Sequence, residues 1–242
     1  MPFQHYVFKK SDCEPREDEP LYVYLDGDGN SWIRDGFVSE DPTPIVPIAL
    51  DLLGQGRSCG IYISRPCTFG LAELDPACEP RQWTVDRYSS RTIGSLSGVL
   101  DQVVSPERPI VLVGHSGGGL LASHLIRGQE AIVGLVTLAA NLDLSAWTAY
   151  HGFGPEVVAA TPPSPFPLGA EIVQLHVFGA LDSNVPMSVA LDGLDRNTRS
   201  AAILIEGVDH ACCWLDEWPG LREIFQQRIE KAARSRSSSS AR

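Results

Sequence analysis

The chain has 242 residues, of which 43% are hydrophobic and 20% are charged. This length and composition are typical of one globular domain with a sizeable core. The formal net charge of −11 argues against nucleic acid and anionic membrane surfaces as partners, because both would repel the chain. No apolar run approaches the roughly 18 residues of a membrane-spanning helix. The first residues, "MPFQHYVFKKSDCEPREDEP", lack the apolar segment of a signal peptide, so the sequence as written predicts a cytoplasmic protein.

Predicted strands and helices alternate along the chain. In chain order they are a strand at 21–25, a helix within 45–56, a strand at 60–64, a helix within 89–104, a strand at 110–113, a helix within 117–128, a strand within 131–141, a strand within 171–182, a helix within 185–194, a strand within 200–210 and a helix within 220–235. The strands are runs of Val, Ile and Leu with little alternation, which is typical of strands covered on both faces. The order therefore predicts an α/β fold with a mostly parallel central sheet and helices on both faces.

The domain organisation follows from the same pattern. There is no internal repeat and no long linker, so residues 1–232 are predicted to form a single domain. The proline-rich stretch 141–170 lies between two predicted strands and is interpreted as a short cap insertion. The Ser- and Arg-rich end, 233–242, is predicted to be disordered.

The sequence "VGHSGGG" places Ser116 between glycines, directly after the strand at 110–113 and before a helix. A strand, a sharp turn and a helix are the context of a nucleophile elbow, in which small neighbours allow a strained serine to project from the sheet edge. The alternative is a phosphate-binding glycine loop. That loop would need G-x-G-x-x-G spacing in a first strand–turn–helix unit, and the turn here is in the middle of the chain.

A nucleophilic serine needs a base, and the base needs an orienting acid. Asp182 follows the strand within 171–182, and His210 follows the next strand, which gives the order Ser, Asp, His expected on such a sheet. His151, in the cap stretch, is the one serious rival for the base. Asp209 is the rival for the acid, although it adjoins His210 and should point elsewhere.

An acyl-transfer site also needs donors for a developing oxyanion. The backbone N–H of Gly117, directly after the serine, is the first candidate. The second is expected in the loop "DGDG" after the first strand, where the N–H of Asp28 is the preferred choice and that of Gly27 the second choice. The alternative is a plain Asp-Gly hairpin turn, but a helix rather than a strand is predicted to follow.

Six cysteines occur at positions 13, 59, 67, 78, 212 and 213, without a C-x-x-C pair and without zinc-ligand spacing to histidines. The sequence therefore predicts no metal site. Cys67 and Cys78 flank a loop-like stretch and could bridge it, or all six could be buried thiols. The residues alone leave both readings open.

These motifs resemble the α/β-hydrolase superfamily over nearly the whole chain, from "YLDGDG" to "VDHACCW". The stretches "SRPC", "DPACEPRQWTVDRYS", "AANLDLSAWTAYHG" and "GALDSNVP" are similar to those of a group of small bacterial α/β hydrolases, some named as lipoproteins and mostly of unassigned substrate. The resemblance implies the α/β-hydrolase fold and a disulfide between Cys67 and Cys78. It also implies export to the periplasm, which differs from the cytoplasmic location that the N-terminus predicts.

The cap stretch holds Trp147, His151 and Phe153 among prolines. These side chains fit a small lid over Ser116, or a surface loop that its aromatic residues attach to the body. Asn141 follows a strand end, where it could face the site or cap the following helix.

The sequence thus predicts a carboxylesterase-like serine hydrolase that cleaves a small-molecule ester or thioester through an acyl-enzyme, without metal or organic cofactor. A serine peptidase or amidase would use the same residues, but the short cap counts against it. A non-catalytic binding module on this scaffold would be expected to lack one of Ser116, Asp182 and His210. The acyl group and the oligomeric state are not readable from the sequence.

Overall fold

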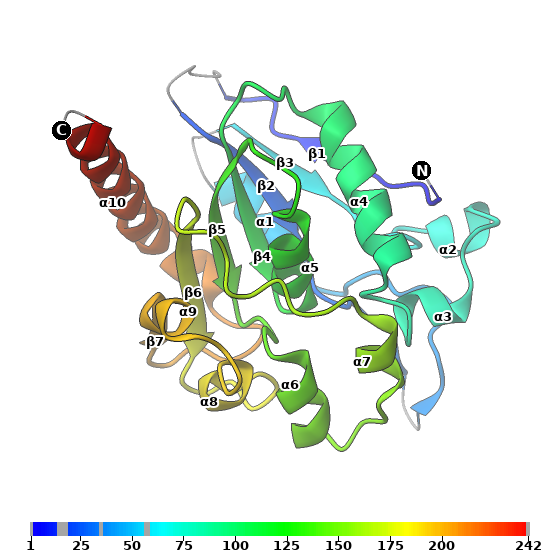
Figure 1. Cartoon of the computed structure of the whole chain (residues 1–242). Helices are drawn as coiled ribbons and strands as arrows, with labels where there is room; N and C mark the ends of the chain where they lie inside the picture. The colour runs from blue at the N-terminus through cyan, green and yellow to red at the C-terminus, as the bar shows by residue number, and fades with distance from the viewer. Residues whose placement is uncertain (1, 14–18, 34–35, 56–58, 241–242) are drawn as a thin grey trace.

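The structure is a computed structural model that describes residues 2–13, 19–33, 36–55 and 59–240. Its described residues form one seven-stranded sheet in the order β1-β3-β2-β4-β5-β6-β7 (Figure 1). β1 pairs with β3 in antiparallel fashion, and the remaining neighbours are parallel. The strands are β1 (Val7–Lys9), β2 (Leu21–Leu25), β3 (Gly60–Ile63), β4 (Ile110–His115), β5 (Ile132–Leu138), β6 (Val173–Gly179) and β7 (Ala202–Ile205).

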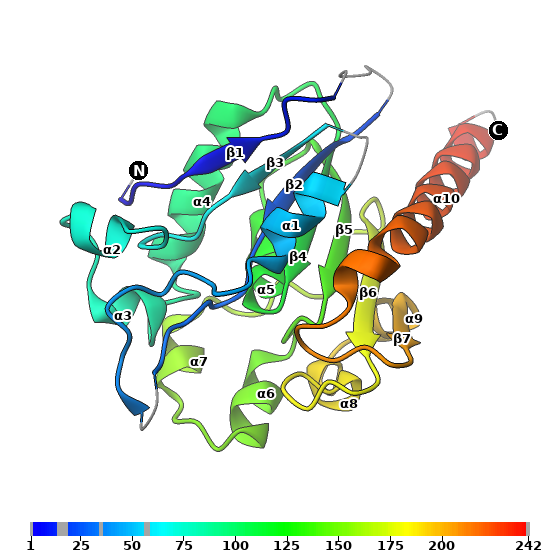
Figure 2. The ribbon, with the colours of Figure 1, turned by 180° about the vertical axis from the view of Figure 1, so that it is seen from behind.

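Helices cover both faces of the sheet. α4 (Ser90–Val103) and α5 (Gly117–Leu125) lie on one face, whereas α1 (Ile48–Gln55) and α10 (Trp214–Ser240) lie together on the other (Figures 1 and 2). Every residue of β2 and β4 is buried. Two-sided burial explains why these strands are continuous apolar runs, and it confirms the fold class that the sequence predicts. The parallel strands therefore end at a common edge, where the loops that follow them meet.

The other helices are short and lie in the connections. They are α2 (Leu71–Leu74), α3 (Pro80–Trp83), α6 (Leu144–Tyr150), α7 (Glu156–Ala160), α8 (Met187–Ala190) and α9 (Arg196–Ser200). α6 and α7 form most of the regular structure in the 141–170 stretch. The helix expected within 185–194 is reduced to the single turn of α8, because Pro186 precedes it and Leu191 has left helical geometry.

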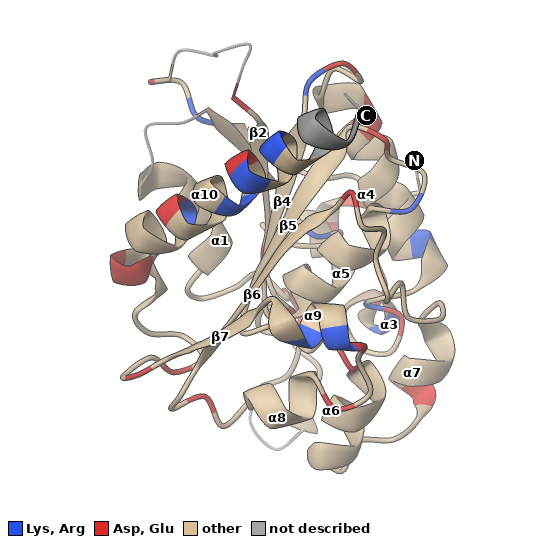
Figure 3. Cartoon of the chain, turned by 60° about the vertical axis from the view of Figure 1, so that its left-hand side comes forward, with Lys and Arg blue, Asp and Glu red and all other residues tan. Residues whose placement is uncertain are grey.

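The C-terminal segment differs from its expected disorder. α10 continues through residues 233–240, and residues 241–242 lie outside the described residues. Ala233, Arg234 and Arg236 in this segment have good helix propensity, and the other five residues are Ser. Figure 3 shows that basic and acidic residues occur along α10. Among the described helices, α10 included, none combines the length and apolar character needed to cross a membrane.

All six cysteines are paired in the structure. The Cys67–Cys78 disulfide implied by the resemblance is present, with a Cα–Cα distance of 5.6 Å. Cys13 and Cys59 form a second disulfide, and the adjacent Cys212 and Cys213 form a third. The sequence did not indicate the last two pairs, and the alternative of six free thiols is wrong.

Candidate active site

Ser116 lies at the sharp turn between β4 and α5. Its φ of 51° falls in the left-handed region, which a residue with a side chain adopts only under constraint. The constraint comes from close backbone approaches on both sides. A Cβ at Gly114 would lie 2.4 Å from Cα of Gly119, and one at Gly118 would lie 2.2 Å from the carbonyl oxygen of Leu25. Only glycine fits at these two positions, so the sequence of small residues produces the turn.

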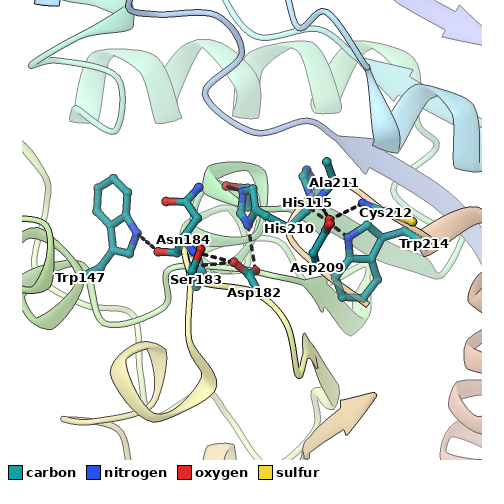
Figure 4. A network of polar contacts seen from close by, with 12 residues as sticks. His115, Trp147, Asp182, Ser183, Asn184, Asp209, His210, Ala211, Cys212 and Trp214 are labelled. Carbon is teal, nitrogen blue, oxygen red and sulfur yellow. Dashed lines mark hydrogen bonds and ion pairs between the residues drawn. The ribbon is translucent and has the colours of Figure 1, made fainter. Parts of the chain in front are cut away.

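The structure brings Ser116, His210 and Asp182 into one chain of hydrogen bonds. Nε2 of His210 lies 3.1 Å from Oγ of Ser116, and its Nδ1 lies 2.8 Å from Oδ2 of Asp182. Figure 4 shows the imidazole of His210 above the carboxylate of Asp182. The three residues follow β4, β6 and β7, so the edge where parallel strands end accounts for their meeting.

The carboxylate of Asp182 is held by its own loop. Oδ1 accepts hydrogen bonds of 2.8 Å from the backbone N–H groups of Asn184 and Val185. Burial alone would raise the pKa of Asp182, but the hydrogen bonds from His210, Val185 and Asn184 outweigh burial and hold that pKa below its usual range. Asp182 therefore remains a carboxylate at neutral pH and orients one tautomer of His210.

His210 is anchored through its backbone by side chains that sequence reasoning did not assign. Nε2 of His115 lies 2.9 Å from the carbonyl oxygen of His210, and Nε1 of Trp214 donates to the same oxygen at 3.1 Å. A carbonyl only accepts, so Nε2 of His115 carries the proton. Burial lowers the pKa of His115 to about 4, which keeps the ring neutral at physiological pH. The ring thus lies beside His210, with 5.2 Å between centroids, instead of contacting Ser116.

The rival residues have other partners. Nε2 of His151 lies 2.8 Å from the carbonyl oxygen of Asn184, and its ring stacks on Phe153. Asp209 accepts hydrogen bonds from the backbone N–H groups of Ala211 and Cys212, and so closes the turn that carries His210 (Figure 4). Neither rival is positioned to replace Asp182 or His210 beside Ser116.

The candidate oxyanion donors lie on either side of Ser116. Gly117 is the first residue of α5, where an N–H has no acceptor within the helix. Within the described part of the chain, the N–H groups of Gly117 and Asp28 donate no hydrogen bond. A Cβ at Gly27 would lie 2.9 Å from Cβ of Ser116, which shows how closely the loop after β2 approaches the serine. Gly117 thus follows Ser116 directly, and Asp28 borders the same cavity as Ser116.

A buried charged network holds the loop after β2. Nη1 of Arg65 donates to Oδ1 of Asp28 at 2.9 Å, and Nε of Arg87 lies 3.1 Å from Oδ2. The hydroxyl of Tyr88 lies 2.7 and 2.6 Å from the two carboxylate oxygens. Burial would raise the pKa of Asp28, but Arg87 and Arg65 more than compensate and lower it. Nδ2 of Asn141 donates to the Tyr88 hydroxyl, so Asn141 supports this network.

Two adjoining cavities open at the site. The serine cavity, about 300 Å³, includes Ser116, His210 and Asp28 in its walls. The aromatic cavity, about 720 Å³, is lined by Trp147, His151 and Phe153 from the cap stretch, together with Trp32 and Arg87. Asp28, Gly29, Trp147 and Asn184 border both cavities. Three of the four pocket residues expected from the sequence therefore line the aromatic cavity, and Asn141 lines neither.

No group of three His, Cys, Asp or Glu side chains suited to a metal ion occurs among the residues that the structure describes. The side chains at the site are instead a hydroxyl, an imidazole, carboxylates and guanidinium groups. These groups can move a proton and stabilise charge directly.

Three solved structures share the fold at low sequence identity. Est1E from Butyrivibrio proteoclasticus is 16% identical with a TM-score of 0.60, over 93% of this chain and 94% of that one. The α/β hydrolase MGS-MChE2, from a sediment metagenome of the Mar Chica lagoon, is 13% identical with a TM-score of 0.51, over 94% and 95% of the two chains. A puromycin-hydrolyzing peptidase of Mycobacterium tuberculosis is 15% identical with a TM-score of 0.51, over 95% of this chain and 36% of that one.

No curated protein matches the sequence. The family model described as the alpha/beta hydrolase family matches residues 27–228, which is most of the chain and includes the turn at Ser116, the loop of Asp182 and the loop of His210. The chain belongs to the alpha/beta hydrolase family.

Proposed function

We propose that this hydrolase cleaves a carboxylic ester or thioester through an acyl-enzyme formed on Ser116. The observation that carries the proposal is the chain of hydrogen bonds of 3.1 and 2.8 Å that links Ser116 to His210 and His210 to Asp182. This arrangement lets an imidazole take the serine proton while a carboxylate stabilises the imidazolium that results.

The reaction proceeds in two halves. His210 removes the proton from Ser116 as Oγ attacks the carbonyl carbon, and the carbonyl oxygen becomes an oxyanion bound by the N–H groups of Gly117 and Asp28. The tetrahedral intermediate collapses, His210 donates its proton to the departing alcohol or thiol, and an acyl-serine remains. His210 then activates a water molecule that attacks the acyl-serine, which releases the acid and restores Ser116.

The test compares the wild type with Ser116→Ala, using a fluorophosphonate probe and p-nitrophenyl acetate. We expect labelling and an initial burst of nitrophenol only in the wild type, and a loss of kcat of about 10⁶-fold in the variant. An unlabelled wild type with intact circular dichroism would contradict the proposal. Parallel assays of p-nitroanilides distinguish the esterase reading from a peptidase or amidase, which would cleave them at comparable rates.

A further inference from the structure

The aromatic cavity is larger than the serine cavity and shares four bordering residues with it. It measures about 720 Å³, against about 300 Å³ for the serine cavity. A substrate whose ester lies at Ser116 can therefore extend past Trp147 into the aromatic cavity. The walls there include the indole of Trp32 and the ring of Phe153, which are about half exposed. The cavity is thus suited to the part of the substrate on one side of the ester bond.

Arg87 is the charged residue buried in the wall of this cavity. Only 5% of its surface is exposed. Its guanidinium carbon lies 5.4 Å from the ring centre of Tyr88 and 5.8 Å from that of Trp147. Its Nε is 3.1 Å from Oδ2 of Asp28 but is not aligned for a hydrogen bond, and it has no hydrogen-bond partner. A buried guanidinium N–H without a hydrogen-bond partner is costly unless a ligand supplies one.

Arg65, on the other side of the same carboxylate, differs from Arg87 in this respect. It donates to Oδ1 of Asp28 at 2.9 Å and to the backbone oxygen of Arg87 at 2.7 Å. It does not line either cavity at the site. The hydrogen bonds of Arg65 are therefore made within the protein, and Arg87 is the one of the two arginines that lines the aromatic cavity.

The charges around Asp28 do not balance. Arg65 and Arg87 bring two positive charges to one carboxylate, and the remaining partner, Tyr88, is neutral because burial raises its pKa further above its ordinary value. Glu156 also borders the aromatic cavity, but it is exposed to solvent, which weakens its field. Asp26, a further buried carboxylate nearby, borders the serine cavity and not the aromatic cavity, and it accepts a hydrogen bond from the backbone N–H of Ala49. In the wall of the aromatic cavity at Arg87, the two guanidinium groups thus outnumber the single carboxylate of Asp28, which favours an anion.

We propose that the substrate is an ester that carries a carboxylate, and that Arg87 binds this carboxylate in the aromatic cavity. The inference rests on the proposed function of Ser116 and adds the chemical class of its substrate. Arginine suits the role because its forked donors match the two oxygens of a carboxylate. The apolar part of the substrate between the ester and the carboxylate packs against Trp147 and its aromatic neighbours.

The test uses two pairs of esters, one for each side of the ester bond. For the acyl side, mono-p-nitrophenyl adipate is compared with p-nitrophenyl hexanoate, which has the same acyl length and no carboxylate. For the alcohol side, p-carboxyphenyl acetate is compared with phenyl acetate. Each ester is assayed for kcat/KM with the wild type, Arg87→Gln, Arg87→Lys and Arg91→Gln. Arg91 is exposed on α4, over the ring of Phe3, so its substitution changes the net charge equally and leaves the cavity intact.

We expect the ratio of kcat/KM for the charged ester to that for the neutral ester to fall about 10- to 100-fold in Arg87→Gln, for at least one pair. Arg87→Lys should retain part of the ratio and Arg91→Gln all of it. Unchanged ratios for both pairs in a folded Arg87→Gln variant would overturn the proposal, provided that Ser116→Ala abolishes turnover of the neutral esters. Turnover that survives Ser116→Ala would instead overturn the proposed function.

If Arg87→Gln does not fold, inhibition of the wild type by a dicarboxylate tests whether the cavity binds a carboxylate. Adipate should compete with p-nitrophenyl hexanoate at a concentration at least about 10-fold lower than adipamide does, because only the acid carries the charge. Equal inhibition by the two compounds would overturn the assignment of Arg87.

Discussion

The two sides of the candidate site are held in place by different kinds of interaction. On the serine side, Ser116, His210 and Asp182 stand at the ends of strands and are joined by single hydrogen bonds. On the opposite side, two buried arginines and Tyr88 surround the carboxylate of Asp28 and hold it in place. The serine side is set by the geometry of the sheet, whereas the Asp28 side depends on a balance of buried charge.

This difference predicts that the two sides contribute differently to catalysis and to stability. A side chain placed by strand ends can be altered with a large effect on chemistry and a small effect on folding. A side chain that neutralises buried cations cannot be removed without a folding penalty, because the cations remain. The Asp28 side should therefore govern stability and substrate choice, and the serine side the chemical step.

Substituting Asp182 or Asp28 by Asn tests this difference between the two sides most directly. Asp182→Asn should lower kcat about 10⁴-fold, because His210 loses the group that fixes its tautomer, with little change in Tm. Asp28→Asn should lower the free energy of unfolding by about 3 to 5 kcal/mol, because two buried guanidinium groups lose their counter-charge. Steady-state kinetics and urea denaturation of both variants check this. Similar losses of stability in the two variants would contradict the prediction that only the Asp28 side governs stability.

The Cys67–Cys78 disulfide gives a second test of the Asp28 side, because it closes a loop in the segment between Arg65 and Arg87. The two cysteines are separated by 11 positions. A loop of that size corresponds to about 3 kcal/mol of stability, which the double variant Cys67→Ser/Cys78→Ser should lose in urea denaturation. Loosening this segment should also raise KM for the charged ester while fluorophosphonate labelling of Ser116 continues.

The matched control is Cys13→Ser/Cys59→Ser, which removes the disulfide at the start of β3. It should also lower stability but leave the preference between charged and neutral esters unchanged. A change in that preference in the control alone would show that the 65–88 segment does not position Arg87.

The serine side could be predicted from the sequence because one rule places all its members. Ser116, Asp182 and His210 each follow an apolar run, and parallel strands end at one edge. The bounds of the long elements were predictable for the same reason. β1 was not, because three partly exposed residues in "VFK" carry too little apolar pattern to mark a strand.

The Asp28 side could not be assembled from the sequence. Arg65, Arg87 and Tyr88 lie in irregular segments, where no periodicity tells which side chain turns inward. A weak signal existed, since the stretches "SRPC" and "DRYS" contain all three and belong to the resemblance with small bacterial hydrolases. The sequence also could not predict the role of His115, because its hydrogen-bond partner is a backbone carbonyl 95 positions away.

His115 offers the mildest test of the serine side. His115→Leu removes the donor to the carbonyl of His210, leaving only that of Trp214, and should lower kcat about 10-fold. His115→Gln can place an amide N–H near the position of Nε2 and should restore most of the loss. Steady-state kinetics of the two variants measure this difference. If both variants are equally slow, the ring of His115 acts by packing and not as a donor.

The lowered pKa of His115 also predicts that the stability of the fold changes with pH. Burial lowers the pKa of His115 to about 4 in the folded protein, against an ordinary value of 6.5. Between these values only the unfolded chain binds the proton, so this residue costs stability as pH falls from 6.5 toward 4, by up to about 3 kcal/mol. His124 and His176, whose pKa values burial lowers to about 4 and about 3, act in the same direction and remain in every variant. His115→Gln removes one such contribution, so its Tm should fall less steeply than that of the wild type between pH 7 and pH 4 in calorimetry. Parallel curves for the two proteins would mean that the imidazole of His115 binds its proton in the folded state as readily as in the unfolded chain.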